Sequence, residues 1–401
     1  MIQLFINALA ASAGGGLTYI RNVLPQLVAR DDVRTTLLVS SPMHGEVKDS
    51  GNVVLLQGPD ASGSARRFWY EQRCLPALIH RSRANVLLST GNFALFRSPV
   101  PQILLSRNAL YRSVDFLRDL HARGDYRAWV DTELKSAIAK WSIQTADRTV
   151  APSAAFAHEL RGWTGKDVIC IHHGFDREAF FGDRRPLSPA VCASLAATDG
   201  SLRLLFVSHY NYYRNFETLI RATAILKERL HPRRVRLILT CRLSSKQNPG
   251  NYRAEGAAAL VNQLKVRDEV VELGGVPYAS LHHLYRACDL YVTPAYAETF
   301  AHPLVEAMAS ALPVVASDLP VHREICDQAA LYFPRFSPEL LAQRVVEASC
   351  SAELRKAMQE AGIRRSQDFS WARHVDELLK LARGLCCSEP PQTLGVHAIE
   401  K

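Results

Sequence analysis

Residues 298–306, Glu-Thr-Phe-Ala-His-Pro-Leu-Val-Glu, place two carboxylates eight residues apart where a strand should give way to a helix. Residues 289–295, Asp-Leu-Tyr-Val-Thr-Pro-Ala, form a short apolar run that predicts a buried strand. Pro303 suits a first helical turn, where its missing N–H costs nothing. Such a helix start can bind phosphate, and carboxylates beside it can accept hydrogen bonds from sugar or ribose hydroxyls. A sugar nucleotide offers both groups.

Length and composition indicate a soluble globular protein of two domains. The chain has 401 residues, of which 48% are hydrophobic and 22% charged. Its nine cysteines include no C-x-x-C pair and are odd in number, which favours reduced thiols in the cytoplasm over a disulfide framework or a structural zinc site. No apolar run approaches the roughly 18 residues of a membrane span.

The formal charge of +9 implies an anionic partner or surface. Residues 66–140 carry 13 Lys and Arg against 6 Asp and Glu, a net charge of +7. This stretch includes Arg66, Arg67, Arg73, Arg81, Arg83 and Arg97, with Phe68, Trp69 and Tyr70 among them. This excess of positive charge fits two interpretations. One is a solvated basic face, and the other is contact with anionic lipid headgroups or a lipid-diphosphate acceptor. The sequence contains no nucleic-acid recognition motif, so we expect no nucleic-acid partner.

Strands and helices alternate along the chain, which predicts an α/β protein with parallel sheets covered by helices. One alternating series covers residues 1–175. Residues 176–200 are rich in Gly, Pro, Asp and Ser and read as a linker, and a second series covers residues 201–370. A helix is expected at about 371–384, and residues 386–401 read as a disordered tail.

Residues 298–333 resemble the signature region of the retaining GT-B glycosyltransferases of family 4, the glycosyl transferases group 1. The resemblance covers the glutamate loop, the following helix, Pro313-Val-Val-Ala-Ser-Asp318, Glu324-Ile325 and Ala329-Ala-Leu-Tyr-Phe333. It implies two doubly wound Rossmann-like domains that face each other across a cleft. Residues 1–175 would bind the acceptor and residues 201–370 the sugar nucleotide, with the helix at 371–384 packing back on the first domain.

A second resemblance lies in Phe206-Val-Ser-His-Tyr-Asn-Tyr-Tyr-Arg-Asn-Phe216, where the family has two basic residues that grip the diphosphate. Arg214 occupies the second basic position, where a guanidinium can hydrogen-bond phosphate and offset charge on the leaving group. His209 occupies the first, where the family usually has Arg. The resemblance therefore assigns catalytic roles to Arg214, His209 and Glu298. Of these, Glu298 would hold the hydroxyls of the donor sugar.

The resemblance also implies that Glu306 binds the ribose hydroxyls. The other residues to which it assigns substrate contacts are Phe300, Ala301, His302, Pro303, Leu304, Gly15, Gly16, Arg107, Asn108 and Val276. Backbone N–H groups from 300 to 304 would contact sugar or phosphate, a glycine loop at 14–16 would line the cleft, and the turn at 274–277 would read the base. Arg107-Asn108 stand where many relatives have His-Asp, and Thr299 and Ala301 replace glycines of the common Glu-Gly-Phe-Gly pattern. His302 is either aimed at the sugar or structural.

The expected function is transfer of a hexose, with retention, from a UDP- or GDP-sugar to a glycan or lipid-linked acceptor in surface polysaccharide assembly. We expect no cofactor and no metal, since this architecture has no D-x-D metal motif, and a cytoplasmic location at the inner face of the membrane. Two alternatives stay open: a GT-B sugar-nucleotide epimerase, and a non-catalytic sugar-nucleotide binder or scaffold.

Overall fold

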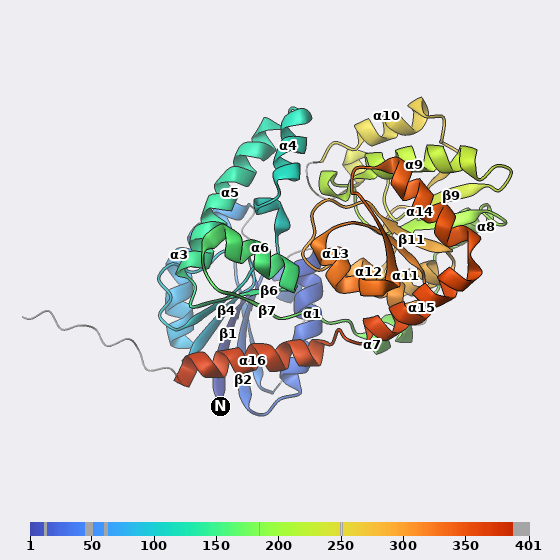
Figure 1. The fold of residues 1–401 in the computed structure, drawn as a ribbon. Coiled ribbons are helices and arrows are strands. Elements are labelled where there is room, and N and C mark those ends of the chain that lie inside the picture. The colour runs from blue at the N-terminus through green and yellow to red at the C-terminus, as the bar shows by residue number, and fades with distance from the viewer. Residues whose placement is uncertain are drawn as a thin grey trace, which may run out of the picture. The chain divides into compact units, whose positions relative to one another are not determined.

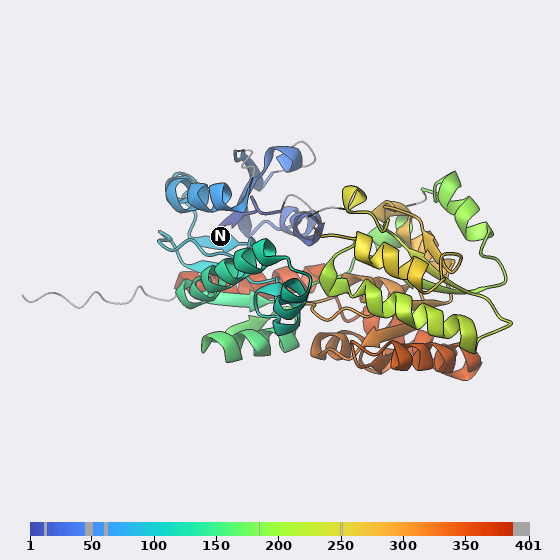
Figure 2. The ribbon, with the colours of Figure 1, turned by 90° about the horizontal axis from the view of Figure 1, so that it is seen from above.

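The computed structural model describes residues 1–11, 14–44, 51–59, 63–183, 185–248, 250 and 252–387. These residues form two parallel β-sheets, each with helices on both faces (Figures 1 and 2). The chain separates into two compact units. Residues 1–106, 141–150 and 372 onward form the first unit, and residues 107–140 and 151–371 form the second.

The first sheet has seven strands in the order β3-β2-β1-β4-β5-β6-β7. Its strands are β1 (Ile2–Asn7), β2 (Val33–Val39), β3 (Val53–Gln57), β4 (Val86–Ser89), β5 (Gln102–Leu105), β6 (Arg148–Ala151) and β7 (Val168–Cys170). The helices between them are α1 (Gly14–Val28), α2 (Ser41–His44), α3 (Ser64–Arg81), α4 (Val114–Ala122), α5 (Tyr126–Thr145) and α6 (Ala154–Thr164), with a 3₁₀ turn η1 (Ala109–Tyr111). The central strands β4 and β5 are buried along their whole length, as expected for parallel strands covered on both faces.

The second sheet has six strands in the order β10-β9-β8-β11-β12-β13. Its strands are β8 (Leu202–Phe206), β9 (Val235–Leu239), β10 (Val270–Glu272), β11 (Leu290–Thr293), β12 (Val314–Ser317) and β13 (Ala330–Phe333). Its helices and 3₁₀ turns are η2 (Tyr212–Arg214), α9 (Phe216–Arg229), η3 (Ser245–Gln247), α10 (Glu255–Gln263), α11 (Tyr278–Arg286), α12 (His302–Ala309), α13 (Pro320–Cys326), η4 (Asp327–Ala329), α14 (Pro338–Cys350) and α15 (Ala352–Ser366).

The region expected to be a linker contains two short helices, α7 (Arg177–Gly182) and α8 (Pro189–Ala196). The last helix, α16 (Trp371–Cys387), includes the first two residues of the expected tail, and residues 388–401 lie outside the described part of the chain. Within the first unit, α16 packs on α1, where Tyr19 Oη and His374 Nε2 are 3.0 Å apart and buried. No helix in the described ranges is long and apolar enough to cross a membrane.

Each sheet reverses its strand order once, and these reversals position the candidate site. In the second sheet β8 lies beside β11, and the chain continues from β8 toward β9 on one side and from β11 toward β12 on the other. Loops that leave the carboxyl ends of two such strands diverge, and ligands of open α/β sheets bind in the crevice between them. In the first sheet the equivalent strands are β1 and β4.

Candidate functional site

The two strands at the reversal of the second sheet lead directly to Arg214 and Glu298. The loop after β8 forms η2, which ends at Arg214, and the loop after β11 carries Glu298. Nη1 of Arg214 donates a hydrogen bond to Oε2 of Glu298, so residues 84 positions apart form an ion pair. Asn215, at φ 57°, turns the chain into α9 and donates from its side chain to the Pro294 carbonyl at 3.1 Å. That bond ties the two loops together.

The Arg214–Glu298 pair is buried, and each partner keeps the other charged. Burial alone would lower the pKa of the Arg214 guanidinium, but the Glu298 carboxylate holds that pKa above its ordinary value. Burial would likewise raise the pKa of Glu298, but Arg214 and the Thr299 amide, which donates to Oε1 at 3.0 Å, hold it below its ordinary value. Nε of Arg214 is a buried donor with no hydrogen-bond acceptor among the described residues. The pair can therefore receive an additional acceptor.

The environment of Glu306 favours the protonated carboxyl, whereas that of Glu298 favours the ionised one. Glu306 lies in the second turn of α12, is only 5% exposed, and accepts a hydrogen bond from Tyr285 Oη of α11 at 2.8 Å. Burial raises the pKa of the Glu306 carboxyl to about 7, although the bond from Tyr285 opposes this shift. No cation pairs with Glu306 within the described ranges of the chain. A ligand that brings hydroxyl donors to Glu306 would therefore stabilise its ionised form.

Two further buried residues near this site were not identified from the sequence. Tyr291 of β11 is 2% exposed, and its pKa is raised by burial, with Arg214, Glu306 and Glu298 all near enough to influence it. His322 of α13 is fully buried, and its Nδ1 lies 2.9 Å from the Ser317 carbonyl. Burial lowers the pKa of His322, and the Glu298 carboxylate opposes this shift. Tyr291 lies in the strand segment 289–295 and His322 within the region 298–333, but neither sequence pattern gave them a role, so only the three-dimensional structure associates them with the two carboxylates.

The loop before α12 is fixed by backbone conformation and ring packing. Ala301 is the N-cap of α12 and has φ 63°, a left-handed conformation that costs an alanine roughly 1 kcal/mol. Phe300 is buried against the rings of His173 and Phe369, at centroid distances of 5.4 and 5.3 Å. The Leu304 amide already donates to the Ala301 carbonyl at 2.9 Å, and Pro303 has no amide hydrogen. The Leu304 N–H is therefore already engaged within the first turn of α12, and the ligand contacts of this loop stay predictions.

His302 belongs to a stack of rings. It lies parallel to His173, with 5.3 Å between ring centroids, and 6.0 Å from Trp371. Its Nε2 is 3.3 Å from Nδ1 of His173. The segment that carries His173 passes so close to α16 that a Cβ on Gly174 would lie 2.1 Å from the Trp371 amide nitrogen. Of the two interpretations of His302, this packing favours the structural one.

The remaining predicted residues of the second unit are distributed over other loops. His209 is exposed in the loop after β8, and Val276 lies in the half-buried turn before α11. Arg107 and Asn108 follow β5, and both are half-buried. The Asn108 side chain accepts from the Leu110 amide at 3.0 Å, so it caps η1.

The glycines expected in a loop begin a helix instead. Gly15 and Gly16 are not in a loop, because the first turn of α1 begins at Gly14. A Cβ on Gly16 would approach the Ala11 Cα to 3.0 Å. Close packing against the preceding segment therefore explains a glycine at this position.

Known proteins match both the chain and its fold. The family described as glycosyl transferases group 1 matches residues 193–365. A structure of sucrose-phosphate synthase from Thermosynechococcus elongatus superposes with a TM-score of 0.75 at 16% identity, covering 96% of this chain and 99% of that chain. Anabaena HepE in complex with UDP and glucose superposes with a TM-score of 0.68, also at 16% identity, over 96% of this chain and 100% of the other.

The chain has the GT-B fold, and its residues 193–365 match the glycosyl transferases group 1. Curated relatives of this GT-B protein include two D-inositol 3-phosphate glycosyltransferases. The one from Kineococcus radiotolerans is 29% identical over 60% of this chain and 58% of its own. The one from Corynebacterium aurimucosum is 31% identical over 67% of this chain and 64% of its own. The matches therefore span less than two thirds of either relative.

Replacement of Ala301 by glycine in this GT-B protein should raise its stability. Glycine adopts positive φ without strain, and its extra freedom in the unfolded chain offsets part of that gain, which leaves up to about 1 kcal/mol. Urea unfolding of Ala301→Gly should show a higher midpoint at unchanged slope. Ala307→Gly, in the interior of the same helix, should instead lose about 1 kcal/mol. A lower midpoint for Ala301→Gly would contradict the left-handed loop.

Glu306 should make the stability of the protein fall as the pH rises. Its folded pKa of about 7 lies above the value of an unfolded glutamate, so its contribution is complete below pH of about 4.5 and is lost toward pH 7. The Glu306→Gln variant lacks this pH-dependent contribution to stability. The difference in unfolding free energy between the Glu306→Gln variant and wild type should therefore shift by about 3 kcal/mol between pH 5 and 8, in favour of the variant at pH 8.

The matched test is Glu298→Gln. The pKa of Glu298 lies below its ordinary value, so its contribution is present above the unfolded pKa and is lost as the pH falls. Glu298→Gln should therefore be less stable than wild type at pH 7. Parallel pH profiles for the two variants would contradict the opposite environments of the two carboxylates.

Proposed function

We propose that this protein is a retaining glycosyltransferase that moves a hexose from a UDP- or GDP-sugar to a glycan or lipid-linked acceptor. The observation that carries the proposal is the buried Arg214–Glu298 pair at the strand-order reversal, in the same domain as the unpaired carboxyl of Glu306. Complexes of HepE with UDP and with UDP-glucose favour a uridine nucleotide as the first donor to test. Surface polysaccharide assembly at the cytoplasmic face of the membrane is the proposed setting.

Arg214 would bind the diphosphate without giving up Glu298. Its Nη1 is engaged by the carboxylate, whereas its buried Nε has no acceptor among the described residues and can donate to a phosphate oxygen. A guanidinium forms several charge-assisted hydrogen bonds in one plane, so one side chain can orient both groups. Glu298, held by Arg214 and the Thr299 amide, would accept hydroxyls of the donor sugar. Exposed His209 would add a hydrogen bond to the phosphates.

Glu306 would hold the ribose. A carboxylate can accept hydrogen bonds from two hydroxyl groups. These bonds offset the free-energy cost of burying the charge, which otherwise favours the protonated form. Tyr285 fixes its orientation from α11. Val276, in the turn before the same helix, would contact the base.

The transfer step needs no protein nucleophile. The acceptor oxygen bonds to the anomeric carbon on the face that the nucleotide leaves, while the bond from that carbon to the β-phosphate oxygen breaks. The proton of the acceptor hydroxyl passes to the departing phosphate, whose negative charge Arg214 stabilises. This chemistry uses no metal, so we propose that turnover continues in excess EDTA.

A thermal-shift panel of UDP, GDP, ADP, CDP and their sugars should single out one nucleotide. A ligand at 100 times its Kd adds about 2.7 kcal/mol to the unfolding free energy, which is readily seen in Tm. The shift should disappear in Glu306→Ala and persist in Glu228→Ala, which removes an exposed carboxylate from α9. A folded protein that responds to no nucleotide would overturn the donor-site proposal.

The same preparation separates the alternative functions. Nucleotide release that depends on an added acceptor supports a transferase, and inositol phosphates belong in the acceptor panel because of the curated relatives. Release or isomerisation without acceptor would support an epimerase. Binding without turnover would support a scaffold.

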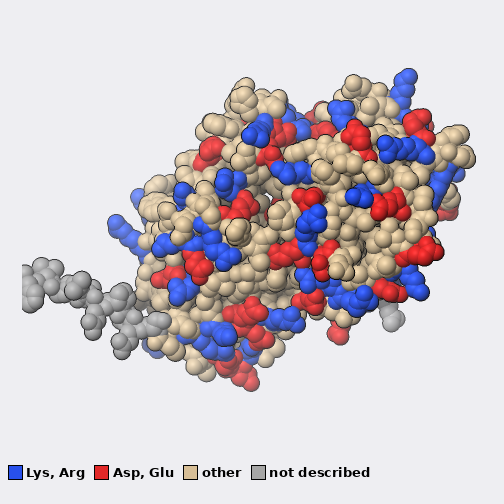
Figure 3. All heavy atoms as spheres, in the orientation of Figure 1, with Lys and Arg blue, Asp and Glu red and all other residues tan. Residues whose placement is uncertain are grey.

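We also propose that a surface of the first unit contacts an anionic membrane. Here Trp69 is 60% exposed on α3, and Trp141 is 56% exposed at the end of α5 and stacks on Phe96 with 3.9 Å between ring centroids. Trp69, Tyr70, Arg73 and Cys74 line an open cavity of 380 Å³. Tryptophan and arginine together suit the headgroup layer of a membrane. On the face drawn in Figure 3, basic and acidic side chains are interspersed, so attachment by a uniform basic field is not expected there.

Flotation with vesicles tests this surface. Phosphatidylglycerol vesicles should carry the protein upward more than phosphatidylcholine vesicles, and Trp69→Ala should reduce the bound fraction severalfold. Phe336→Ala, which removes an exposed ring of the second unit, serves as the control and should bind like wild type. Equal flotation of Trp69→Ala and wild type would contradict the assignment of the surface.

A further inference from the structure

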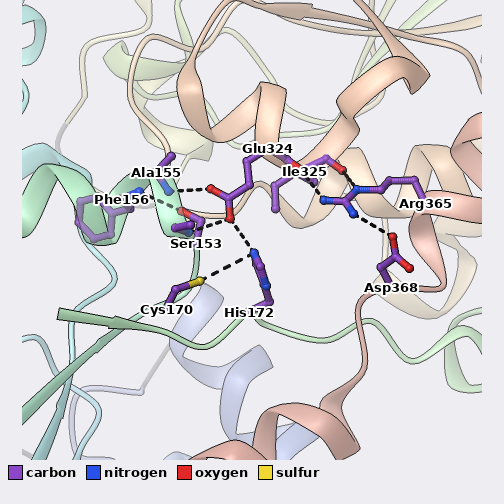
Figure 4. Close-up of polar contacts among 10 residues, drawn as sticks. Ser153, Ala155, Phe156, Cys170, His172, Glu324, Ile325, Arg365 and Asp368 are labelled. Carbon is purple, nitrogen blue, oxygen red and sulfur yellow. Dashed lines mark hydrogen bonds and ion pairs between the residues drawn. The ribbon is translucent and has the colours of Figure 1, made fainter.

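Three potential metal ligands converge in the second unit, outside the proposed donor site (Figure 4). Cys170 ends β7, His172 follows two residues later, and Glu324 comes from α13. In extended chain, residues i and i+2 point to the same side, and the intervening Ile171 is buried on the opposite side. Sγ of Cys170 lies 3.8 Å from Nε2 of His172, which lies 2.6 Å from Oε1 of Glu324. The three ligand atoms all lie within 4.8 Å of one another.

Neighbouring groups hold the carboxylate in place. The Ala154 amide donates to Oε1 of Glu324 at 2.7 Å, and the Ala155 amide donates to Oε2 at 2.6 Å. Arg365 fixes the backbone of α13 by donating to the Glu324 carbonyl at 2.6 Å and to the Ile325 carbonyl at 3.1 Å (Figure 4). Hydrogen bonds of this kind orient the ligands in metal sites and tune their strength.

The imidazole and the thiol are also positioned by their surroundings. The His172 ring packs edge-on against Phe369, with 5.8 Å between centroids. Cys170 is half-buried at the end of a sheet strand, so its backbone is fixed by β7. The side chain of His172 is 41% exposed and that of Glu324 is 17% exposed, so an ion can reach the cluster from solvent.

The donor set selects among metals by its chemistry. Thiolate, imidazole and carboxylate together suit Zn²⁺, whereas Mg²⁺ and Ca²⁺ prefer oxygen ligands alone. One thiolate and one carboxylate would neutralise the two positive charges of the ion. Tetrahedral zinc, with bonds of about 2.0 Å to nitrogen and about 2.3 Å to sulfur, separates those two atoms by roughly 3.5 Å. The observed 3.8 Å between Sγ and Nε2 is close to this value.

Binding requires one local rearrangement. Nε2 of His172 and Oε1 of Glu324 are hydrogen-bonded at 2.6 Å, and a metal bound between them would separate the two atoms to roughly 3.3 Å. The thiol of Cys170 also loses its proton on binding. Glu324 can keep both backbone bonds, because a carboxylate has about four acceptor positions.

We propose that Cys170, His172 and Glu324 form a binding site for Zn²⁺, with the fourth position taken by water. The ion would join the segment after β7 to α13, and through Glu324 to the start of α6. The three ligands come from positions as far apart as 170 and 324, and none is among the donor-site residues. The proposal is therefore independent of the proposed function.

Cobalt substitution tests the site in the full-length, reduced, metal-free protein. Titration with Co²⁺ should give the visible bands of a tetrahedral ion together with a thiolate-to-cobalt charge-transfer band, saturating at one equivalent and removed by Zn²⁺. Cys170→Ser should lose the charge-transfer band and bind at least about tenfold more weakly. Cys350→Ser, which alters an exposed cysteine of α14, should keep both the band and the affinity.

Two further variants guard against indirect effects. Glu324→Gln keeps an oxygen for the α6 amides, and His172→Asn keeps a polar side chain, so both should fold, as judged by circular dichroism, and bind Co²⁺ at least about tenfold more weakly. A charge-transfer band that survives in Cys170→Ser would place the metal on other cysteines and overturn the proposal. A folded wild type without any band would overturn it as well, and would leave His172 and Glu324 as a hydrogen-bonded pair.

Discussion

The buried ion pair between Arg214 and Glu298 is the interaction on which the candidate site depends. Removing two charges from water is costly, and their attraction offsets that cost only when the geometry is good. The geometry is supplied by the strand order, since β8 and β11 are adjacent and their loops leave the same edge of the sheet. The Asn215 side chain fixes the loops further by bonding the carbonyls of Pro294 and Arg335. Loss of either charge would leave its partner buried and uncompensated.

The same scaffold gives the two carboxylates different chemistry. Glu298 is held ionised by a guanidinium and an amide, whereas Glu306 has only a tyrosine hydroxyl and a pKa of about 7. Glu298 is thus prepared before any ligand arrives. Glu306 becomes a good acceptor only when hydroxyl donors replace the water that burial removed. A ligand with hydroxyl groups at both ends would therefore gain different amounts of free energy from the two contacts.

Much of the fold followed from the sequence, because alternation of short apolar runs with helical segments is a local signal. The run at 289–295 contains β11, and the GT-B fold expected from the glutamate motif is confirmed. The roles of Glu298, Glu306 and Arg214 stay predictions. The segment expected as a glycine loop is the first turn of α1, since nothing local in Gly-Gly-Gly distinguishes a loop from a helix start, and the ligand contacts of Gly15 and Gly16 stay predictions.

The rest of the site depends on contacts distant in sequence. Tyr285 and His322 reach the carboxylates only through helix packing, and His302 is explained by rings from residues 173 and 371. The cluster at Cys170 shows the same limit. The absence of closely spaced cysteines argues against zinc, yet the chain at the end of β7 brings Cys170 beside His172, and helix α13 supplies Glu324.

The segment between β7 and α7 links these features. His172 faces Glu324, whereas His173 faces His302 and the ring of Phe300. Gly174 then passes the Trp371 backbone where no side chain would fit. Successive residues of one extended segment thus contact α13, the loop that carries the glutamate motif, and the start of α16. Any shift of this segment would displace Phe300, because close-packed rings transmit a displacement rather than absorb it. The segment therefore acts as a support for the candidate site, although it contributes none of the charged groups proposed to touch the donor.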